Sequence, residues 1–275
     1  LVENFKIEYN KLTKPVALRG ISFGGITLKE NYKMTIAYDG SRYFGWEHQP
    51  NTDLTIQGKL ESVLSLMTGT EVEVIGAGRT DAGVHASYYI AHFDLSNEFV
   101  DLVHLAFKVN CLLPFDIAVQ KVTKVGPEAH ARFDATYREY KFFISTTKNP
   151  FHRHFSMKET RPLDIQSMNK AAATLFGYTD FTSFSRLGSD VKTNNCIIYK
   201  AEWNEAGGQL VFTIRADRFL RNMVRAIVGT LLDVGLGKIT VDDFVRIIEQ
   251  KDRCAAGTSA EAKGLFLVDI GYPES

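Results

Sequence analysis

A single carboxylate stands between two glycines in a short run that could do chemistry. The run reads Gly78-Arg79-Thr80-Asp81-Ala82-Gly83-Val84-His85, and alternating apolar residues flank it on both sides. Glycine adopts backbone conformations that other residues resist, so Gly-x-x-x-x-Gly between two strands predicts a tight, specially shaped loop. Such a loop would hold the Asp81 carboxylate at a fixed point and direction. The alternative is an ordinary turn in which Asp81 satisfies loop amides.

Arg225 is the second candidate, because it stands in a strongly apolar segment, Phe219–Val234, that we expect to be helical. An arginine is rarely held against apolar surface without a compensating anion. A guanidinium within salt-bridge distance would lower the pKa of Asp81 and keep it charged. The alternative is a solvated stripe of Arg218, Arg221 and Arg225 on one face of the helix.

Hydrophobic periodicity predicts the elements that would position these groups. The first half reads as β-α-β-β-α-β, with elements near Tyr32–Tyr38, Thr55–Met67, Val72–Ala77, Ala86–Asp94, Glu98–Val109 and Ile117–Val122. The second half repeats that order. Its strands lie near Arg138–Thr146, Cys196–Asn204, Gln209–Arg215 and Leu265–Ile270, and its main helices are Ile165–Phe176 and Phe219–Val234. Gly207-Gly208 predicts a hairpin turn, and Thr240 the N-cap of a further short helix.

This order is the ferredoxin-like arrangement, given twice. We therefore expect an α+β fold of two ferredoxin-like halves whose antiparallel sheets join around a central active-site cleft. The expected divisions are an N-terminal extension of unknown role over residues 1–30, one half over 31–125 that carries the Asp81 loop, and one over 126–275 that carries Arg225.

Composition is ordinary for a globular protein, with 45% hydrophobic and 23% charged residues in a chain of 275. No apolar run is long enough for a membrane span, and no secretory signal is visible at the start. The three cysteines are far apart, which indicates reduced thiols in a cytoplasmic protein. His152 and His154 lack a third ligand nearby, so no metal site is expected. Zero net charge argues mildly against nucleic acid, although a local basic cleft remains compatible with it.

Several motifs together resemble one family. The Asp81 run is similar to the signature of TruA-type tRNA pseudouridine synthases, and the Phe219–Val228 segment resembles the helix with that family's active-site arginine. The other blocks that agree in order and spacing are Tyr38-Asp39-Gly40-Ser41, Tyr43-Phe44-Gly45-Trp46, Ala91-His92-Phe93-Asp94, His130-Ala131-Arg132-Phe133-Asp134-Ala135, Arg138-Glu139-Tyr140 and Asp180-Phe181-Thr182-Ser183-Phe184. The resemblance runs from about Tyr32 to Pro273.

The resemblance implies an isomerase that converts uridine to pseudouridine at positions 38, 39 and 40 of the tRNA anticodon arm, without cofactor or metal. It implies Asp81, Tyr140 and Arg225 as catalytic residues, and leaves open whether Asp81 acts as nucleophile or base. Tyr140 would stack on the flipped uracil or assist proton removal from C5. Substrate contacts are expected from Arg79, Thr80, Arg132 and Arg221. The family also implies a homodimer with tRNA held across both subunits.

Two segments depart from the family. Gly45-Trp46-Glu47-His48-Gln49 stands where Gly-Trp-Gln-x-Gln is usual, and the segment Ala256–Ala262 lacks both of its usual prolines. The second departure predicts a more flexible loop.

Two other functions remain open. One is a non-catalytic RNA-binding protein, although no RNP string of strand aromatics is present. The other is a nucleoside or glycoside hydrolase, which usually needs a second acidic partner for Asp81.

Overall fold

The computed structural model describes residues 29–96, 101–186, 188 and 192–273. Nearly all of the expected N-terminal extension, residues 1–30, lies outside these. The first half of the described chain contains the following elements: β1 (Glu30–Tyr38), η1 (Gly40–Arg42), α2 (Ile56–Thr68), β2 (Val74–Gly76), β3 (His85–Leu95), α3 (Leu102–Leu112) and β4 (Ile117–Lys124). The start expected for the second helix, at Glu98, falls on residues that are not described.

The second half follows with β5 (Tyr137–Ser145), β6 (Met157–Lys158), α4 (Ile165–Thr174), η2 (Leu175–Gly177), η3 (Thr182–Phe184), β7 (Ile198–Ala206), β8 (Gln209–Ala216), α5 (Met223–Gly235), α6 (Val241–Gln250), η4 (Ala262–Gly264) and β9 (Leu265–Gly271). The predicted hairpin is confirmed, since Gly207 and Gly208 connect β7 to β8 with φ of 58° and 73°. Thr240 caps α6 as expected, in a reciprocal capping box with Asp243.

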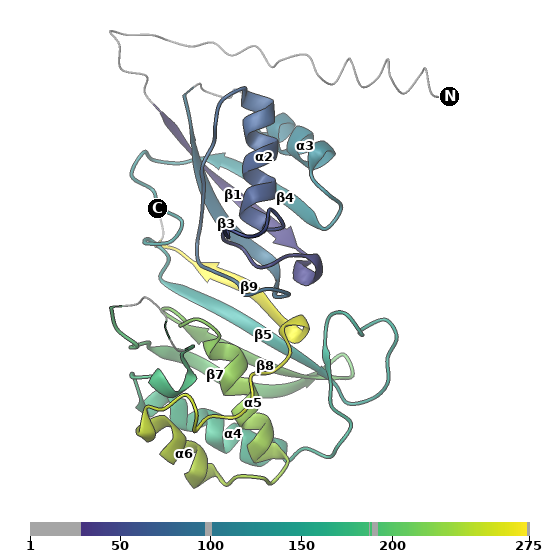
Figure 1. The fold of residues 1–275 in the computed structure, drawn as a ribbon, viewed down its shortest axis with the longest axis vertical. Helices are drawn as coiled ribbons and strands as arrows, with labels where there is room; N and C mark the ends of the chain where they lie inside the picture. The colour runs from purple at the N-terminus through teal and green to yellow at the C-terminus, as the bar shows by residue number, and fades with distance from the viewer. Residues whose placement is uncertain (1–28, 97–100, 187, 189–191, 274–275) are drawn as a thin grey trace.

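The strands form one sheet in the order β4-β1-β3-β9-β5-β8-β7, with β2 added to β3 and β6 added to β5. Each half taken separately has the ferredoxin-like strand order, so the expected α+β class is confirmed. Figure 1 shows the two halves stacked along the long axis, with α2 and α3 in one half and α4, α5 and α6 in the other. Strands β9 and β5 cross the middle. The exact domain boundaries stay a prediction.

The two halves meet through a short parallel ladder between β3 and β9. It contains two residue pairs, His85 with Phe266 and Ala86 with Leu267. Farther along the same edge of β3, the short strand β2 pairs with Ala91–Phe93. The chain therefore leaves the sheet after β2 and returns at β3 beside β9. The Asp81 loop is the segment between β2 and β3, so it lies at the junction of the halves.

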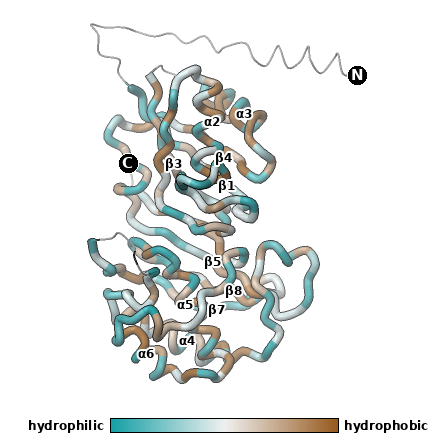
Figure 2. The backbone as a smooth tube through the Cα atoms, in the orientation of Figure 1, coloured by the Kyte–Doolittle hydropathy of each residue, from teal (hydrophilic) through white to brown (hydrophobic). Residues whose placement is uncertain are grey.

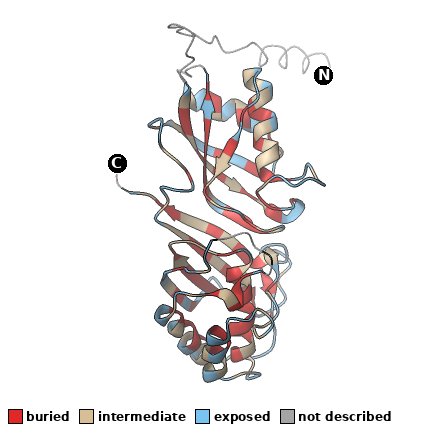
Figure 3. Ribbon diagram, turned by 60° about the vertical axis from the view of Figure 1, so that its left-hand side comes forward, coloured by how far each residue is buried: buried red, intermediate tan, exposed pale blue. Residues whose placement is uncertain are grey.

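The core runs through both halves along the strands and the inner helices. Buried residues mark the strands and α5 in Figure 3, whereas the outer turns of the helices are exposed. Eleven of the 13 residues of α5 are buried. This burial explains why the helix is apolar on almost every side.

Hydrophilic and hydrophobic stretches alternate along the tube in Figure 2. Within the described residues, no helix combines the length and the apolar character that crossing a membrane requires.

The predicted start of the apolar helix at Phe219 is wrong. Helix α5 begins at Met223, because Asn222 has a left-handed backbone with φ of 65° and interrupts helical geometry. Asparagine tolerates this conformation better than most residues. Arg218 and Arg221 therefore precede the helix, and the solvated helical stripe that would have included Arg225 does not form.

Candidate active site

Main-chain hydrogen bonds from the segment that follows β1 hold the Asp81 loop in place. The Trp46 amide donates to the Thr80 carbonyl over 3.1 Å, and the Gly83 amide donates to the Tyr43 carbonyl over 3.2 Å. Gly45 approaches so closely that a Cβ there would lie 2.5 Å from the Thr80 oxygen, and its φ is +101°. Glycine is required at this position on both grounds. These contacts fix the backbone on either side of Asp81, as expected for a loop that aims one carboxylate.

Thr80 itself points inward. Its side chain is buried, and its hydroxyl shares a hydrogen bond of 2.8 Å with the Tyr38 hydroxyl. This geometry gives Thr80 a part in holding the loop. Its expected contact with substrate stays a prediction.

Arg225 lies across the junction from Asp81. Its Nη1 is 3.6 Å from Asp81 Oδ2, and the two side chains keep 21% and 25% of their surface exposed. The Nε of Arg225 donates to the Ala260 carbonyl over 2.7 Å, and the Ala260 amide returns a bond of 2.9 Å to the Arg225 carbonyl. The guanidinium is thus fixed by Ala260 on one edge and faces Asp81 with the other. The sequence-based pairing of these residues agrees with this geometry.

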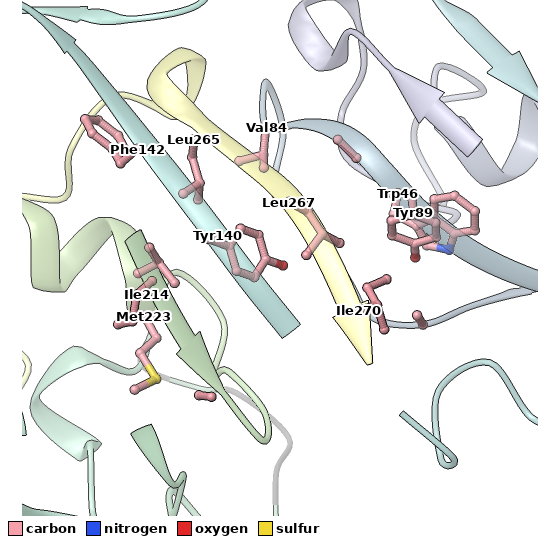
Figure 4. Close-up of a cluster of buried hydrophobic side chains, with 14 of the residues drawn as sticks. Trp46, Val84, Tyr89, Tyr140, Phe142, Ile214, Met223, Leu265, Leu267 and Ile270 are labelled. Atoms are coloured by element: carbon pink, nitrogen blue, oxygen red, sulfur yellow. The ribbon is translucent and has the colours of Figure 1, made fainter. Parts of the chain in front are cut away.

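Tyr140 lies in the middle of β5, between Ile214 on β8 and Leu267 on β9. Figure 4 shows it among the buried side chains at the centre of the sheet. The register between β5 and β9 shifts at Tyr140. The extra residue lies in β9, and β5 keeps its regular pairing with β8 through Tyr140. Its ring packs edge-to-face on Phe219 at 5.2 Å.

Burial raises the pKa of the Tyr140 phenol well above its usual value, and the negative charge of Asp81 raises it further. The positive charge of Arg138 acts in the opposite direction. Tyr140 is therefore a neutral phenol close to both charges. A neutral phenol can stack or donate a hydrogen bond, but it is a poor proton acceptor.

The three arginines expected to contact substrate lie on the surface. Arg79 is 60% exposed and forms an ion pair of 2.6 Å with Glu47. Arg132 and Arg221 are exposed. Within the described part of the chain, none of these three side chains contacts Asp81. Glu47 stands where the family usually has glutamine, so a phosphate that binds Arg79 must compete with a carboxylate.

Two parts of the site were missed by sequence reasoning. One is the carbonyl of Ala260, which orients Arg225. The other is Arg138, which was part of the Arg138-Glu139-Tyr140 motif but received no role. Its guanidinium donates to carbonyl groups of four residues, Ala77, Arg132, Ala135 and Asp217. Any residue type can supply a main-chain carbonyl acceptor, so no signal in the sequence marks either contact.

Side-chain hydrogen bonds hold the segment Ala256–Ala262, which lacks the usual prolines. The Ser259 hydroxyl accepts from Asn222 over 2.6 Å and from Arg253 over 2.9 Å. The Gly257 amide donates to the Thr230 hydroxyl over 3.0 Å. These bonds tie the loop to α5 and so keep Ala260 in place beside Arg225.

Gly229→Ala is expected to destabilise the protein through this loop. A Cβ at Gly229 would lie 1.8 Å from the Thr258 carbonyl oxygen, so either the loop or α5 must move. The overpacking should cost about 2–3 kcal/mol, more than the roughly 1 kcal/mol that alanine gains over glycine inside a helix. Thermal unfolding measures the change. Gly177→Ala is the matched control, because nothing lies within 4 Å of a Cβ there. Equal melting temperatures for the two variants would contradict the close approach.

Comparison with known proteins identifies the family of this chain. The family model described as tRNA pseudouridine synthase matches residues 34–134 and 171–273, which include Asp81 and Arg225. A tRNA pseudouridine synthase A from Bacteroides fragilis is 57% identical over 246 residues, which cover 89% of this chain and 97% of that protein. A tRNA pseudouridine synthase A from Porphyromonas gingivalis is 49% identical, over 86% of this chain and 95% of that protein.

A more distant relative gives the same result. The tRNA pseudouridine synthase A 2 of Bacillus cereus is 41% identical over 88% of this chain and 99% of its own length. The chain belongs to the tRNA pseudouridine synthase family.

Proposed function

We propose that this protein isomerises uridine to pseudouridine in the anticodon stem-loop of tRNA, at positions 38, 39 and 40. One observation carries the proposal. In a member of the tRNA pseudouridine synthase family, the carboxylate of Asp81 from one half meets the guanidinium of Arg225 from the other half at 3.6 Å. Tyr140 is near enough for the Asp81 charge to act on its pKa.

The reaction breaks the bond between C1′ and N1, turns the uracil, and joins C1′ to C5. The C5 proton is lost and N1 gains a proton, so atoms and electrons balance without an oxidant, a cofactor or a metal. Asp81 acts at the sugar, as nucleophile or as base. Arg225 pairs with this carboxylate and fixes its direction. We assign Tyr140 to stacking on the flipped uracil, because a phenol with a raised pKa is a poor acceptor for the C5 proton.

The two alternative functions predict different results when the protein is incubated with tRNA. Incubation with unmodified tRNA, followed by mapping of pseudouridine through carbodiimide-induced primer stops, tests all three. We expect stops in the anticodon arm. A hydrolase would release free uracil and leave abasic sites, and a binding protein would leave the tRNA unchanged. Either of these results would overturn the proposal.

Substrate contacts are assigned to Arg79, Arg132 and Arg221, and Thr80 is assigned to holding the Asp81 loop. The three arginines are exposed and can reach phosphates, whereas Thr80 acts through the loop. We further propose a cytoplasmic homodimer with tRNA held across both subunits. The family resemblance supports the dimer, and the tRNA substrate supports the compartment. Light scattering of the purified protein tests the dimer.

Binding of tRNA is expected to weaken steeply with salt, despite the zero net charge of the chain. Arginines that neutralise phosphates release bound counterions, and each contact adds to the slope of log K against log salt. Fluorescence titration of labelled tRNA at several salt concentrations measures this slope. A fall of less than about two units per decade of salt would mean that fewer than roughly two or three phosphates are neutralised, and the basic cleft would be rejected.

A further inference from the structure

Asp81 and Arg225 come from opposite halves, yet few main-chain bonds join those halves within the residues that the structure describes. The β3–β9 ladder contains two residue pairs. Catalytic groups lose about 100-fold in rate when they are misplaced by about 1 Å. The separation of 3.6 Å between the two side chains therefore needs a further tie across the junction.

Arg138 provides such a tie. It lies on β5 two residues before Tyr140, so both side chains point to the same face of the sheet. Its Nη2 donates to the carbonyls of Ala77 and Arg132, each over 2.7 Å. Its Nη1 donates to the carbonyls of Ala135 and Asp217, over 3.0 and 2.9 Å.

The four carbonyls belong to the segments that carry the site. Ala77 opens the loop four residues before Asp81, and Asp217 follows β8 at the start of the turn that leads to Arg225. Arg132 and Ala135 lie in the connection between β4 and β5. One guanidinium thus contacts the first half, the connection and the second half.

We propose that Arg138 is the positioning residue that sets the Asp81–Arg225 geometry, an inference that rests on the proposed function. The planar guanidinium presents five N–H donors in fixed directions, so it can hold several acceptors at defined angles. All four acceptors are neutral main-chain carbonyls. The shape of the donor group therefore matters as much as its charge. Lysine would keep the charge and lose the geometry.

A merely structural clamp would have a different signature. It would lower the stability of the protein, but the molecules that remain folded would react at the normal rate. A positioning residue lowers the rate of the chemical step in protein that is folded and saturated with tRNA. Single-turnover kinetics below the melting temperature separates the two roles.

The test compares Arg138→Lys with Arg42→Lys. Arg42 is an exposed arginine paired with Asp116 and serves as the matched control. We expect Arg138→Lys to lower the single-turnover rate by more than about tenfold while tRNA affinity changes by less than about threefold. Arg42→Lys should behave as the unchanged protein. A normal rate for Arg138→Lys at saturating tRNA would overturn the inference.

Two further measurements test the inference, and the first of them does not depend on the folding of Arg138→Lys. Millimolar guanidinium should partly restore the rate of Arg138→Ala, because a planar cation can refill the four-carbonyl site, whereas methylammonium should not. The double variant Arg138→Lys/Arg225→Lys should lose less than the product of the single losses if Arg138 acts through that pair. Equal rescue by both cations, or fully multiplicative losses, would overturn it.

Failure of the proposed function would look different. In that case the unchanged protein would form no pseudouridine in tRNA. Failure of the inference alone would leave the unchanged protein active and Arg138→Lys equally active.

Discussion

Asp81→Asn is expected to abolish pseudouridine formation while the fold stays intact. The carboxamide keeps the shape of the side chain but loses its charge and nucleophilicity, so it can neither attack C1′ nor accept a sugar proton. The lost ion pair with Arg225 is long, at 3.6 Å, and partly exposed, so it contributes little to stability. Pseudouridine formed at saturating tRNA measures the effect, and circular dichroism checks the fold.

Asp101→Asn is the matched control for this substitution. Asp101 caps α3 by accepting from the His104 amide, and asparagine caps a helix about as well as aspartate. The control should retain full activity. If Asp81→Asn retained activity within about tenfold of the unchanged protein, a barrier change of roughly 1.4 kcal/mol, Asp81 would not be the catalytic carboxylate.

The order of the elements could be predicted because each has a clear hydrophobic period. The start of α5 could not, since the apolar pattern continues back to Phe219 although the left-handed Asn222 stops the helix. The join between the halves was also beyond sequence reasoning. It consists of two residue pairs between β3 and β9, and parallel pairing between distant segments leaves no local pattern.

In the site, too, some features could be predicted from the sequence and others could not. Asp81 and Arg225 could be paired in advance because the family resemblance marks both residues, and because an arginine in an apolar segment favours a nearby anion. The orientation of Arg225 could not, since it depends on the Ala260 carbonyl in a segment that lacks its usual prolines. The expectation of a more flexible loop followed from those missing prolines. The structure shows side-chain bonds from Asn222 and Arg253 to Ser259 in that loop, and its greater flexibility stays a prediction.

Arg225→Lys is expected to lose most of the activity although the charge is kept. Arg225 uses Nε for the Ala260 carbonyl and Nη1 for Asp81, two nitrogens of one rigid plane. Lysine has a single nitrogen on a flexible stem, so it can attract the Asp81 carboxylate without fixing its direction. The loss should therefore appear in the chemical step, at more than about tenfold in single-turnover rate, with tRNA affinity within about threefold.

Arg221→Lys provides the contrast for that experiment. Arg221 is an exposed residue four positions earlier, assigned here to a phosphate, and a lysine also binds phosphate as a point charge. We expect a small change in affinity and a normal rate at saturation for this variant. Binding and single-turnover rates measured on both proteins separate the two roles. If Arg225→Lys bound tRNA poorly but reacted normally once saturated, Arg225 would be a phosphate contact and not the residue that orients Asp81.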